Sequence, residues 1–530
     1  MRDDSGDGVD VVGAQGQPPQ DRASAPSRVV ATLCSAVGEQ RHGLVTEQSG
    51  VASSRHRRNF RRCAMVRRGE HAVVLGASMA GLLAARVLAD FYDRVTVVER
   101  DRLTAADGPR RGVPQGKHVH ALLPSGSEAL EVLFPGVLAD LVAGGTKVVE
   151  DYTEFYFSVG GNRLSRDVQP GVLTYLPTRP RLEGCVRERV RALPAVRIVD
   201  GSDAVGLVAD GTRSRVTGVR VMARAAGSAE EVLRADLVVD AMGRGTRTPT
   251  WLRGLGYDLP AEESVSVQMG YSSLSVRLRP GTEPEKLVLI GPAPDRPIGM
   301  ALFATEDDDT WLFTATGYRG HHPATSLAEM VDGIATFAPS HVVGALRHAE
   351  PLSEVATYRY DANRRRRYDR LSRFPRGLIV FGDAMCGFNP IYAQGMSVAA
   401  LQAIALRDCL RGSGDDVERR FFRAAAAPVG VAWRLAVGAD LTQPLVDGVR
   451  PPQIRLVNRY VRHLLDVGRH DPVVASQFLL VSALVDPPSR LLRPGIIARV
   501  LRGVVRSRRV ENAPANADTA DPKLIHMAGE

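Results

Sequence analysis

The sequence contains few cysteines, and none of the five forms a C-x-x-C pair. This lack argues against zinc ribbons and dithiol redox centres, so we expect no metal, and the lack of a disulfide framework fits a reducing cytoplasm. Long apolar runs are missing too. The nearest one, residues 473–485, contains polar side chains and is shorter than the roughly eighteen residues of a membrane-spanning helix. We therefore predict a cytoplasmic chain in which residues 473–485 form a buried helix.

The start of the chain lacks a continuous apolar segment, which argues against a secretory signal. Residues 1–68 are rich in Gly, Ser, Arg and Gln and carry no periodic apolar positions, so we expect a disordered leader. Met65 lies just before the first predicted strand, and we expect natural translation to start there rather than at Met1. Residues 511–530 are predicted to form a disordered tail.

The formal charge of +9 comes mainly from basic residues in the leader, at residues 364–367 and near the C-terminus. Charge runs are usually solvated faces and tails, so we expect no nucleic-acid partner. The last predicted helix, residues 496–506, has apolar pairs every four residues with arginines between them. A basic amphipathic helix can make peripheral membrane contact, but more often such a helix packs on its own domain.

The first motif is the stretch VVLGASMAGLLAARVL, in which a short apolar run meets a glycine turn and then an apolar helix. Its fingerprint is Gly76-x-Ser78-x-x-Gly81, with serine at the position where a dinucleotide fold usually has glycine. A second strand ends in Glu99-Arg100, about twenty residues on, where an adenosine ribose would offer its hydroxyls. Pyrophosphate would sit at the helix N-terminus, although a purely structural β-α-β unit remains the alternative.

The second motif is the strand-to-turn stretch ADLVVDAMGRGTR, in which Asp240 and Gly243 mark the end of the strand. Taken alone, this stretch has a simpler reading: Asp240 caps a turn while Arg244 and Arg247 face solvent.

The third motif is GLIVFGDAMCGFNPIYAQGM, where a buried strand ends at Asp383 and a loop leads into a long apolar helix over residues 396–410. A carboxylate at a strand end can accept hydrogen bonds from sugar-like hydroxyls, and a helix N-terminus presents unpaired N–H groups. Together they suit the ribityl chain and the N1/O2 edge of a flavin. The alternative is an ordinary strand-loop-helix unit.

These three motifs, in this order and with these separations, resemble the FAD-dependent monooxygenases of the para-hydroxybenzoate hydroxylase fold, the group A flavoprotein hydroxylases. The resemblance covers residues 71–410. It implies that the first motif binds the ADP half of FAD, and that the second is shared between FAD and a transiently bound nicotinamide. In the third motif, it implies that Asp383 holds the ribityl hydroxyls while the loop and helix start face the flavin ring, through Pro390, Gln394, Gly395 and Met396.

Two further segments gain a role from the same resemblance. Arg179, in the stretch TRPRL before a helix, is implied to contact FAD. The stretch GVPQGKHVHALL is similar to a loop that passes near the isoalloxazine in a subgroup of these enzymes. His118 and His120 in that loop are the candidate catalytic residues, although a loop histidine is more often a packing or hydrogen-bonding residue.

The predicted fold is α/β, with a Rossmann-like FAD-binding domain, an inserted antiparallel-sheet substrate domain and a helical C-terminal region. Strand-like alternation at residues 265–278 continues at 286–290 and 311–316. In the helical region, Pro428 should break or kink the helix that contains it. The predicted domains follow the leader and precede the tail: FAD-binding over 69–257 and 361–411, substrate-binding over 258–360, and helical over 412–510.

Only one dinucleotide fingerprint exists, so NAD(P)H would have to visit the flavin as a co-substrate without a domain of its own. The resemblance implies an NAD(P)H-driven monooxygenase (EC 1.14.13-like) that uses molecular oxygen to hydroxylate or epoxidise a small molecule. The apolar alternation of the predicted sheet suggests that this molecule is lipophilic or aromatic, although any antiparallel sheet that packs on a core alternates in the same way. One alternative is a flavin-dependent reductase of prenyl double bonds, of the geranylgeranyl type, and another is a non-catalytic FAD-binding redox protein. The W-x-W-x-I-P signature of flavin-dependent halogenases is absent. The sequence names neither the substrate nor the preferred nicotinamide.

Overall fold

The computed structural model describes residues 67–103, 110 and 112–511, with side-chain surroundings as far as residue 506. The predicted disordered leader and tail, and the expected start at Met65, therefore lie outside the described residues apart from Arg67, Arg68 and Glu511.

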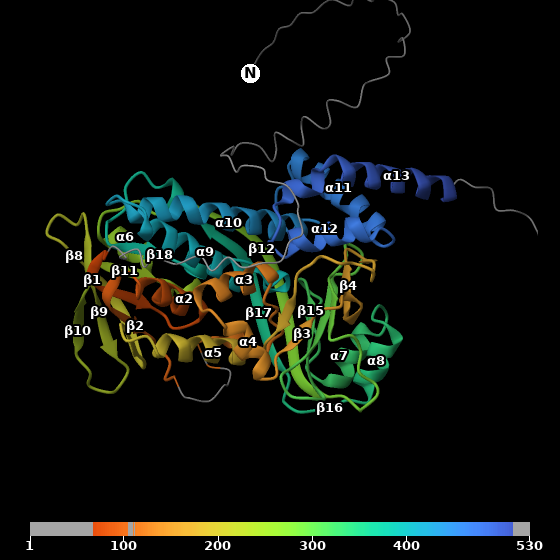
Figure 1. Cartoon of the computed structure of the whole chain (residues 1–530), viewed down its shortest axis with the longest axis horizontal. Helices are drawn as coiled ribbons and strands as arrows, with labels where there is room; N and C mark the ends of the chain where they lie inside the picture. The colour runs from red at the N-terminus through yellow and green to blue at the C-terminus, as the bar shows by residue number, and fades with distance from the viewer. Residues whose placement is uncertain (1–66, 104–109, 111, 512–530) are drawn as a thin grey trace, which may run out of the picture. The chain divides into compact units, whose positions relative to one another are not determined.

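Five parallel strands form the first sheet, in the order β18-β11-β1-β2-β7 (Figure 1). β11 and β18 are buried along their whole length, as expected for a parallel sheet covered on both faces. The predicted Rossmann-like α/β fold is confirmed. In chain order the strands are β1 (Gly69–Leu75), β2 (Tyr92–Val98), β7 (Val196–Val199), β11 (Leu237–Asp240) and β18 (Leu378–Val380).

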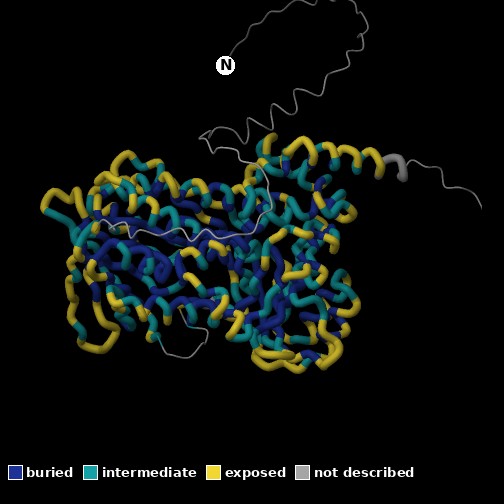
Figure 2. The backbone as a smooth tube through the Cα atoms, viewed as in Figure 1, coloured by how far each residue is buried: buried dark blue, intermediate teal, exposed yellow. Residues whose placement is uncertain are grey.

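The helices that pack on this sheet come from distant parts of the chain. α2 connects β1 to β2, and its alanines and leucines favour a helix with a buried face. α9 contacts α2 and α3, so the third motif packs against the first. Figure 2 shows the buried residues gathered along the parallel sheet and α2. The bounds are α2 (Met79–Leu88), α3 (Pro124–Leu133), α4 (Val137–Ala143), α5 (Arg179–Arg191), α6 (Thr248–Gly254) and α9 (Gln394–Arg411).

The second large sheet has nine strands and is antiparallel except for the parallel pair β13 and β4. Its longest strand, β12, is bulged between Ser266 and Met269, where Gln268 has a φ of 47°. The predicted antiparallel sheet is confirmed, and strands from outside residues 258–360 also join it. The path is β19 (Cys386–Gly387), β17 (Ala356–Arg366), β12 (Glu262–Arg277), β15 (Thr310–Gly317), β14 (Ile298–Ala304), β13 (Leu287–Ile290), β4 (Phe155–Val159) and β5 (Asn162–Arg163), with β16 (Glu350–Pro351) beside β12.

Smaller elements complete these two sheets. α7 and α8 pack their apolar residues on the nine-stranded sheet. A three-stranded antiparallel sheet lies on the chain between β7 and β11, and a two-stranded one precedes α5. These elements are α7 (Leu327–Ile334), α8 (Ser340–Arg347), β8 (Ser202–Ala209), β9 (Val216–Ala223), β10 (Glu230–Arg234), β3 (Lys147–Val149) and β6 (Thr174–Leu176).

The C-terminal region is helical, as predicted, and consists of α10 (Val417–Asp440), α11 (Pro452–Gly468), α12 (Pro472–Ser482) and α13 (Pro494–Glu511). α10 continues through Pro428, so the proline does not end the helix. Ile496 and Val500 of α13 are buried in one cluster with residues of α11 and α12, whereas Leu501 and Val505 are exposed. Within the described part of the chain, no helix is long and apolar enough to cross a membrane.

Candidate functional site

The three sequence motifs begin at neighbouring strand ends. β1 pairs with β11 so that Leu75 lies opposite Asp240, and β11 pairs with β18 so that Asp240 lies opposite Val380. Hydrogen bonds continue past the strands, because the Phe381 N–H donates to the Asp240 carbonyl oxygen over 2.8 Å. Ligands of open parallel sheets bind at this carboxyl edge. The structure thus brings together three pieces of chain that the sequence separates by more than a hundred residues each.

The glycines of these motifs allow their backbones to pack against each other. A side chain on Gly81 would place its Cβ 1.8 Å from the Gly76 carbonyl oxygen. Gly76 has a φ of 103°, and a Cβ there would lie 2.7 Å from the Ala241 carbonyl oxygen. The first turn therefore rests directly on the second motif, and any side chain would separate them.

Ser78, in the middle of the fingerprint, belongs to a buried polar cluster at the start of α2. Its hydroxyl accepts a hydrogen bond from Arg179 Nη2 over 2.8 Å and donates to Glu183 Oε2 over 3.0 Å. Arg110 donates to the other oxygen of Glu183 over 2.8 Å. Although burial opposes ionisation, Arg179 and Arg110 hold the pKa of Glu183 below its usual range. Two guanidinium groups therefore lie beside the helix N-terminus.

Arg110 and Glu183 are site residues that the motif search missed. Glu183 lies four residues after Arg179 on α5, so both face the same side of that helix. Arg110 comes from the segment between β2 and the histidine loop, where no repeat or periodicity marks it. Only the folded chain shows that it also donates to the Ala77 carbonyl oxygen inside the first motif, over 3.0 Å.

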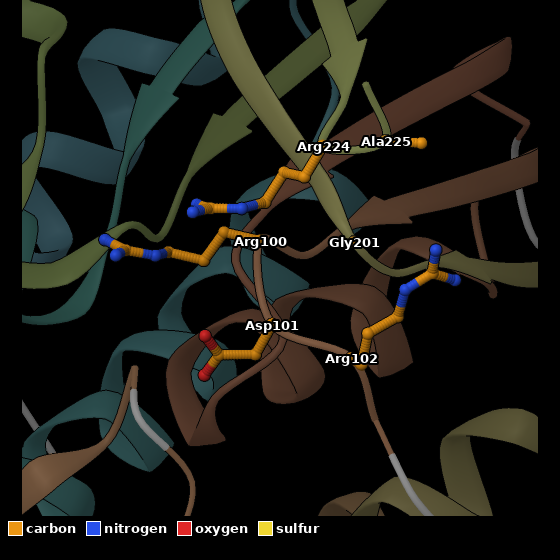
Figure 3. Close-up of a pocket in the computed structure, with 6 residues that line it drawn as sticks. All are labelled: Arg100, Asp101, Arg102, Gly201, Arg224 and Ala225. Atoms are coloured by element: carbon orange, nitrogen blue, oxygen red, sulfur yellow. The ribbon is translucent and has the colours of Figure 1, made fainter. Parts of the chain in front are cut away.

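Glu99 and Arg100 follow β2 and play different roles. The buried Glu99 carboxylate accepts the backbone N–H groups of Ala77 and Asp101, over 2.7 and 2.9 Å, and so fixes the turn at the first motif. Arg100 is exposed. It lines a hollow of about 340 Å³ together with two other arginines, Arg102 and Arg224 (Figure 3). Figure 3 shows the side chains of Arg100 and Arg224 extending toward the same side, which makes the hollow suited to an anionic group.

In the second motif, the Asp240 side chain organises its own loop. The fully buried carboxylate accepts hydrogen bonds from the Met242 N–H over 2.9 Å, from the Thr248 hydroxyl over 2.6 Å and from the Thr246 hydroxyl. Burial raises its pKa and these donors oppose the rise. This is the turn-capping role that the stretch alone suggests. It also places Gly243 against the third motif, since a Cβ on Gly243 would lie 4.0 Å from the Asp383 Cβ.

The simpler interpretation of the second motif predicts that Arg244 faces solvent, but the exposed Arg244 side chain also contacts two tyrosines. Its guanidinium carbon lies 5.0 Å from the ring centre of Tyr360, and it donates a hydrogen bond to the Tyr358 hydroxyl. Both tyrosines belong to β17 of the nine-stranded sheet. The second motif is therefore joined to the nine-stranded sheet through one exposed arginine.

Asp383 in the third motif is partly buried, and among the described residues none donates a hydrogen bond to its carboxylate. Burial raises its pKa, while the charges of Arg244 and Arg179 lower it. Gly395 approaches it closely, because a Cβ there would lie 3.7 Å from Asp383 Oδ1. The carboxylate thus has free acceptor capacity beside the N-terminus of α9.

Other polar atoms near the start of α9 are buried without a partner in the described structure. They are Gln394 Oε1, the Ser397 hydroxyl and the Tyr360 hydroxyl. Buried polar groups normally form hydrogen bonds, so the unpaired atoms of Gln394 and Tyr360 mark a place where a ligand can supply them, whereas the Ser397 hydroxyl lies against Gly126 of α3. Pro390 opens the short turn before α9, and Met396 is buried within its first turn. Orphaned atoms and the strand-end carboxylate together fit a flavin with its ribityl chain.

The two candidate histidines are close to each other but differ in contacts. His118 is buried, and its Nδ1 lies 2.7 Å from the Ser273 hydroxyl on β12. His120 Nδ1 donates to the His118 carbonyl oxygen over 2.9 Å. Burial is the main cause that lowers the pKa of His118 to about 4 and that of His120 to about 3. Both imidazoles are therefore neutral near pH 7, which favours a hydrogen-bonding role over that of a cationic acid.

The buried state of His118 predicts a pH dependence of stability. The folded pKa, about 4, lies below the ordinary value of 6.5, so unfolding between these values takes up a proton. The contribution is present above pH 6.5 and is lost as the pH falls toward 4. The stability lost by pH 5 amounts to about 2 kcal/mol. We expect the melting temperature of His118→Gln to fall less between pH 7 and pH 5 than that of the wild type. The exposed His348→Gln serves as control, and equal slopes in all three proteins would contradict the assignment.

No model of a known protein family matches the chain. The chain is 36% identical over 469 residues to Protein Rv3254 of Mycobacterium tuberculosis (strain ATCC 25618 / H37Rv), covering 84% of this chain and 97% of that protein. It is 27% identical over 363 residues to 6-methylpretetramide 4-monooxygenase of Streptomyces rimosus, covering 67% and 78% of the two chains. The structure of PqsL, a probable FAD-dependent monooxygenase from Pseudomonas aeruginosa, shares the fold at a TM-score of 0.53 and 19% identity, covering 71% and 97%.

The chain belongs to the same family as Protein Rv3254 and has the fold of the FAD-dependent monooxygenases. The resemblance drawn from the three motifs is thereby confirmed. The carboxyl edge of the parallel sheet is the candidate flavin site.

Proposed function

We propose that the chain is an NAD(P)H-driven, FAD-dependent monooxygenase that hydroxylates or epoxidises a lipophilic or aromatic small molecule. The observation that carries the proposal is the unpaired Asp383 carboxylate, which lies between the second motif and the N-terminus of α9. A partly buried carboxylate without a donor is costly unless a ligand supplies one. The hydroxyls of a ribityl chain are donors of the right kind.

The other predicted site residues would contact successive parts of one FAD molecule that lies across the carboxyl edge of the parallel sheet. The pyrophosphate would meet the α2 N-terminus between Gly76 and Gly81, with Arg179 beside Ser78 to balance its charge. The adenosine end would run toward Glu99 and Arg100. The flavin ring would face the Gln394–Met396 backbone and the preceding turn at Pro390. FAD, when bound, supplies the oxygen-activating redox chemistry, and the protein binds it, orients it and excludes water.

The substrate side of the proposed site is formed by aromatic residues of the nine-stranded sheet. The His118 ring centre lies 6.0 Å from that of Tyr271 on β12 and 5.6 Å from that of Tyr358 on β17. His118 is neutral, and a cation, Arg244, lies at the edge of this surface, where it donates a hydrogen bond to the Tyr358 hydroxyl. Neutral aromatic walls favour a lipophilic or aromatic substrate. The relative from Streptomyces rimosus is likewise named for a small organic substrate, 6-methylpretetramide.

The test of this function is a spectroscopic experiment on the purified protein. We expect it to be yellow, or to become so with FAD, to bleach with NADPH or NADH, and to recover its colour in air. FMN should not replace FAD, because FMN lacks the ADP half that the first motif would bind. A protein that takes up no FAD would contradict the flavin assignment. Turnover that continues under nitrogen would identify a reductase instead of a monooxygenase.

A further inference from the structure

The last residue of α10, Asp440, has a fully buried carboxylate that binds four side chains from other parts of the fold. Its Oδ1 accepts from the Tyr318 hydroxyl over 2.6 Å, from the Tyr392 hydroxyl over 2.8 Å and from Asn389 Nδ2 over 2.9 Å. Its Oδ2 accepts from Asn363 Nδ2 over 2.5 Å. No arginine or lysine among the described residues contacts it. This is an unusual environment, because a buried carboxylate normally pairs with a cation.

The four partners determine the charge of Asp440. Each of them donates a hydrogen bond, so only an ionised, acceptor-only carboxylate satisfies all four. A protonated Asp440 could donate its O–H only to a tyrosine hydroxyl, and that hydroxyl would then lose its own hydrogen bond to the carboxyl group. Burial raises the pKa of Asp440, whereas the same four donors favour its charged form. The arrangement of donors supports the carboxylate.

The partners also show what the charge holds in place. Asn389 precedes the short turn Pro390–Tyr392 that leads into α9, and Tyr392 is the last residue of that turn. Asn389 is held further by Tyr271 of β12, whose hydroxyl donates to Asn389 Oδ1 over 2.7 Å and accepts from the Ile391 N–H over 3.1 Å. Asn363 of β17 accepts the Asn389 backbone N–H. One carboxylate thus ties the turn to α10 and to two strands of the nine-stranded sheet.

The turn that is held in this way ends in a strained residue. Ala393 has a φ of 53°, which costs a non-glycine residue roughly 1 kcal/mol or more. Such a conformation persists only when its surroundings fix it. α9 begins at the next residue, Gln394. The direction of the α9 N-terminus therefore depends on the contacts of the preceding turn.

We propose that Asp440 is a positioning residue that fixes the turn Asn389–Tyr392 and, through Ala393, the N-terminus of α9. Because the flavin ring is proposed to face that N-terminus, the inference rests on the proposed function. It assigns to the C-terminal helix α10 a direct part in forming the flavin site. Asp440 itself contacts neither cofactor nor substrate in this role and acts through Asn389 and Tyr392.

The test compares one single variant with one double variant. Asp440→Asn removes the charge and sets an amide N–H₂ against a neighbouring donor. Adding Asn363→Asp exchanges the amide and the carboxylate between positions 363 and 440. The new carboxylate at 363 can accept hydrogen bonds from the Asn389 backbone N–H and from the new amide at 440. The amide oxygen at 440 can still accept from Tyr318, Tyr392 and Asn389 Nδ2. The double variant therefore restores a complete set of hydrogen bonds with unchanged net charge. Asp447→Asn, an exposed carboxylate beyond α10, is the matched control.

Two measurements are made on each protein. In the FAD-free protein, backbone hydrogen exchange of a peptide covering residues 387–396 should be about tenfold faster or more in Asp440→Asn, because one buried donor loses its acceptor. FAD should bind about tenfold more weakly, with an altered visible circular dichroism of the bound flavin. The double variant should recover most of both effects, and Asp447→Asn should match the wild type.

The outcomes separate the inference from the proposed function. The inference is wrong, and the proposed function stands, if the wild type binds FAD and Asp440→Asn matches it in three measurements. These are the hydrogen exchange of the 387–396 peptide, the affinity for FAD and the visible circular dichroism of the bound flavin. If exchange rises equally across the whole chain and the double variant gives no rescue, Asp440 is a general stability residue and the inference is also wrong. If the wild type binds no FAD, the proposed function fails, and exchange in the 387–396 peptide still tests how the turn is held.

Discussion

Asp383→Ala is expected to purify with little or no FAD. The carboxylate has no donor among the described residues, so its hydrogen-bonding capacity is available for a ligand. If it accepts two ribityl hydroxyls, each bond to a charged acceptor contributes about 1.5–3 kcal/mol, and the loss weakens FAD binding about a hundredfold or more. Flavin content after purification and titration of the FAD-free protein with FAD measure the effect.

The same substitution distinguishes a binding role from a structural one. Because Asp383 holds no protein donor, its removal should leave the melting temperature of the FAD-free protein unchanged or slightly higher, since a desolvated charge is removed. Asp415→Ala, an exposed carboxylate in the loop between α9 and α10, is the control for the loss of one negative charge. Full flavin content in Asp383→Ala would show that the third motif does not bind the ribityl chain.

Gly81→Ala is expected to destabilise the protein and to abolish FAD binding together. Its Cβ would lie 1.8 Å from the Gly76 carbonyl oxygen and 2.9 Å from the carbonyl carbon, so backbone must move. Gly76 cannot yield easily, because its own turn rests against Ala241 of the second motif. Overpacking of this kind costs about 1–3 kcal/mol and sometimes more. The measurements are the melting temperature and the flavin content.

The matched control is Gly333→Ala in α7. A Cβ at Gly333 meets no atom within 4 Å, and its backbone is helical. Alanine there should stabilise the protein by about 0.5–1 kcal/mol, because it restricts the unfolded chain and favours the helix. If Gly81→Ala melted like wild type and kept its flavin, the first motif would tolerate separation from the second, and the close packing described here would be unimportant.

The site was predictable from sequence where its parts are local. Each motif follows the fixed spacing of a strand, a turn and a helix, as at Gly76, Gly81 and the strand before Asp383. Such a spacing spans only a few residues, so the sequence alone shows it. Their meeting at one sheet edge was expected from the resemblance, and the pairing of β1, β11 and β18 shows it directly.

The parts that escaped prediction depend on contacts between distant residues. Asp440 lies 122 positions from Tyr318 and 77 from Asn363, and nothing near it in sequence distinguishes it from a helix-terminal aspartate. Arg110 and Glu183 are 73 residues apart and are likewise joined only by folding. Pro428 was expected to break or kink its helix, and the break does not occur because α10 continues through the proline.

The strand order β18-β11-β1 has a consequence for biosynthesis. On the ribosome, β1 emerges roughly 160 residues before its neighbour β11, an interval of about 8–32 s at 5–20 residues per second. During that time an apolar strand waits with one edge uncovered, which is the situation that recruits chaperones. Loading of the prosthetic group must come later still, after Asp440 leaves the exit tunnel, so nascent chains cut short before α10 should emerge colourless.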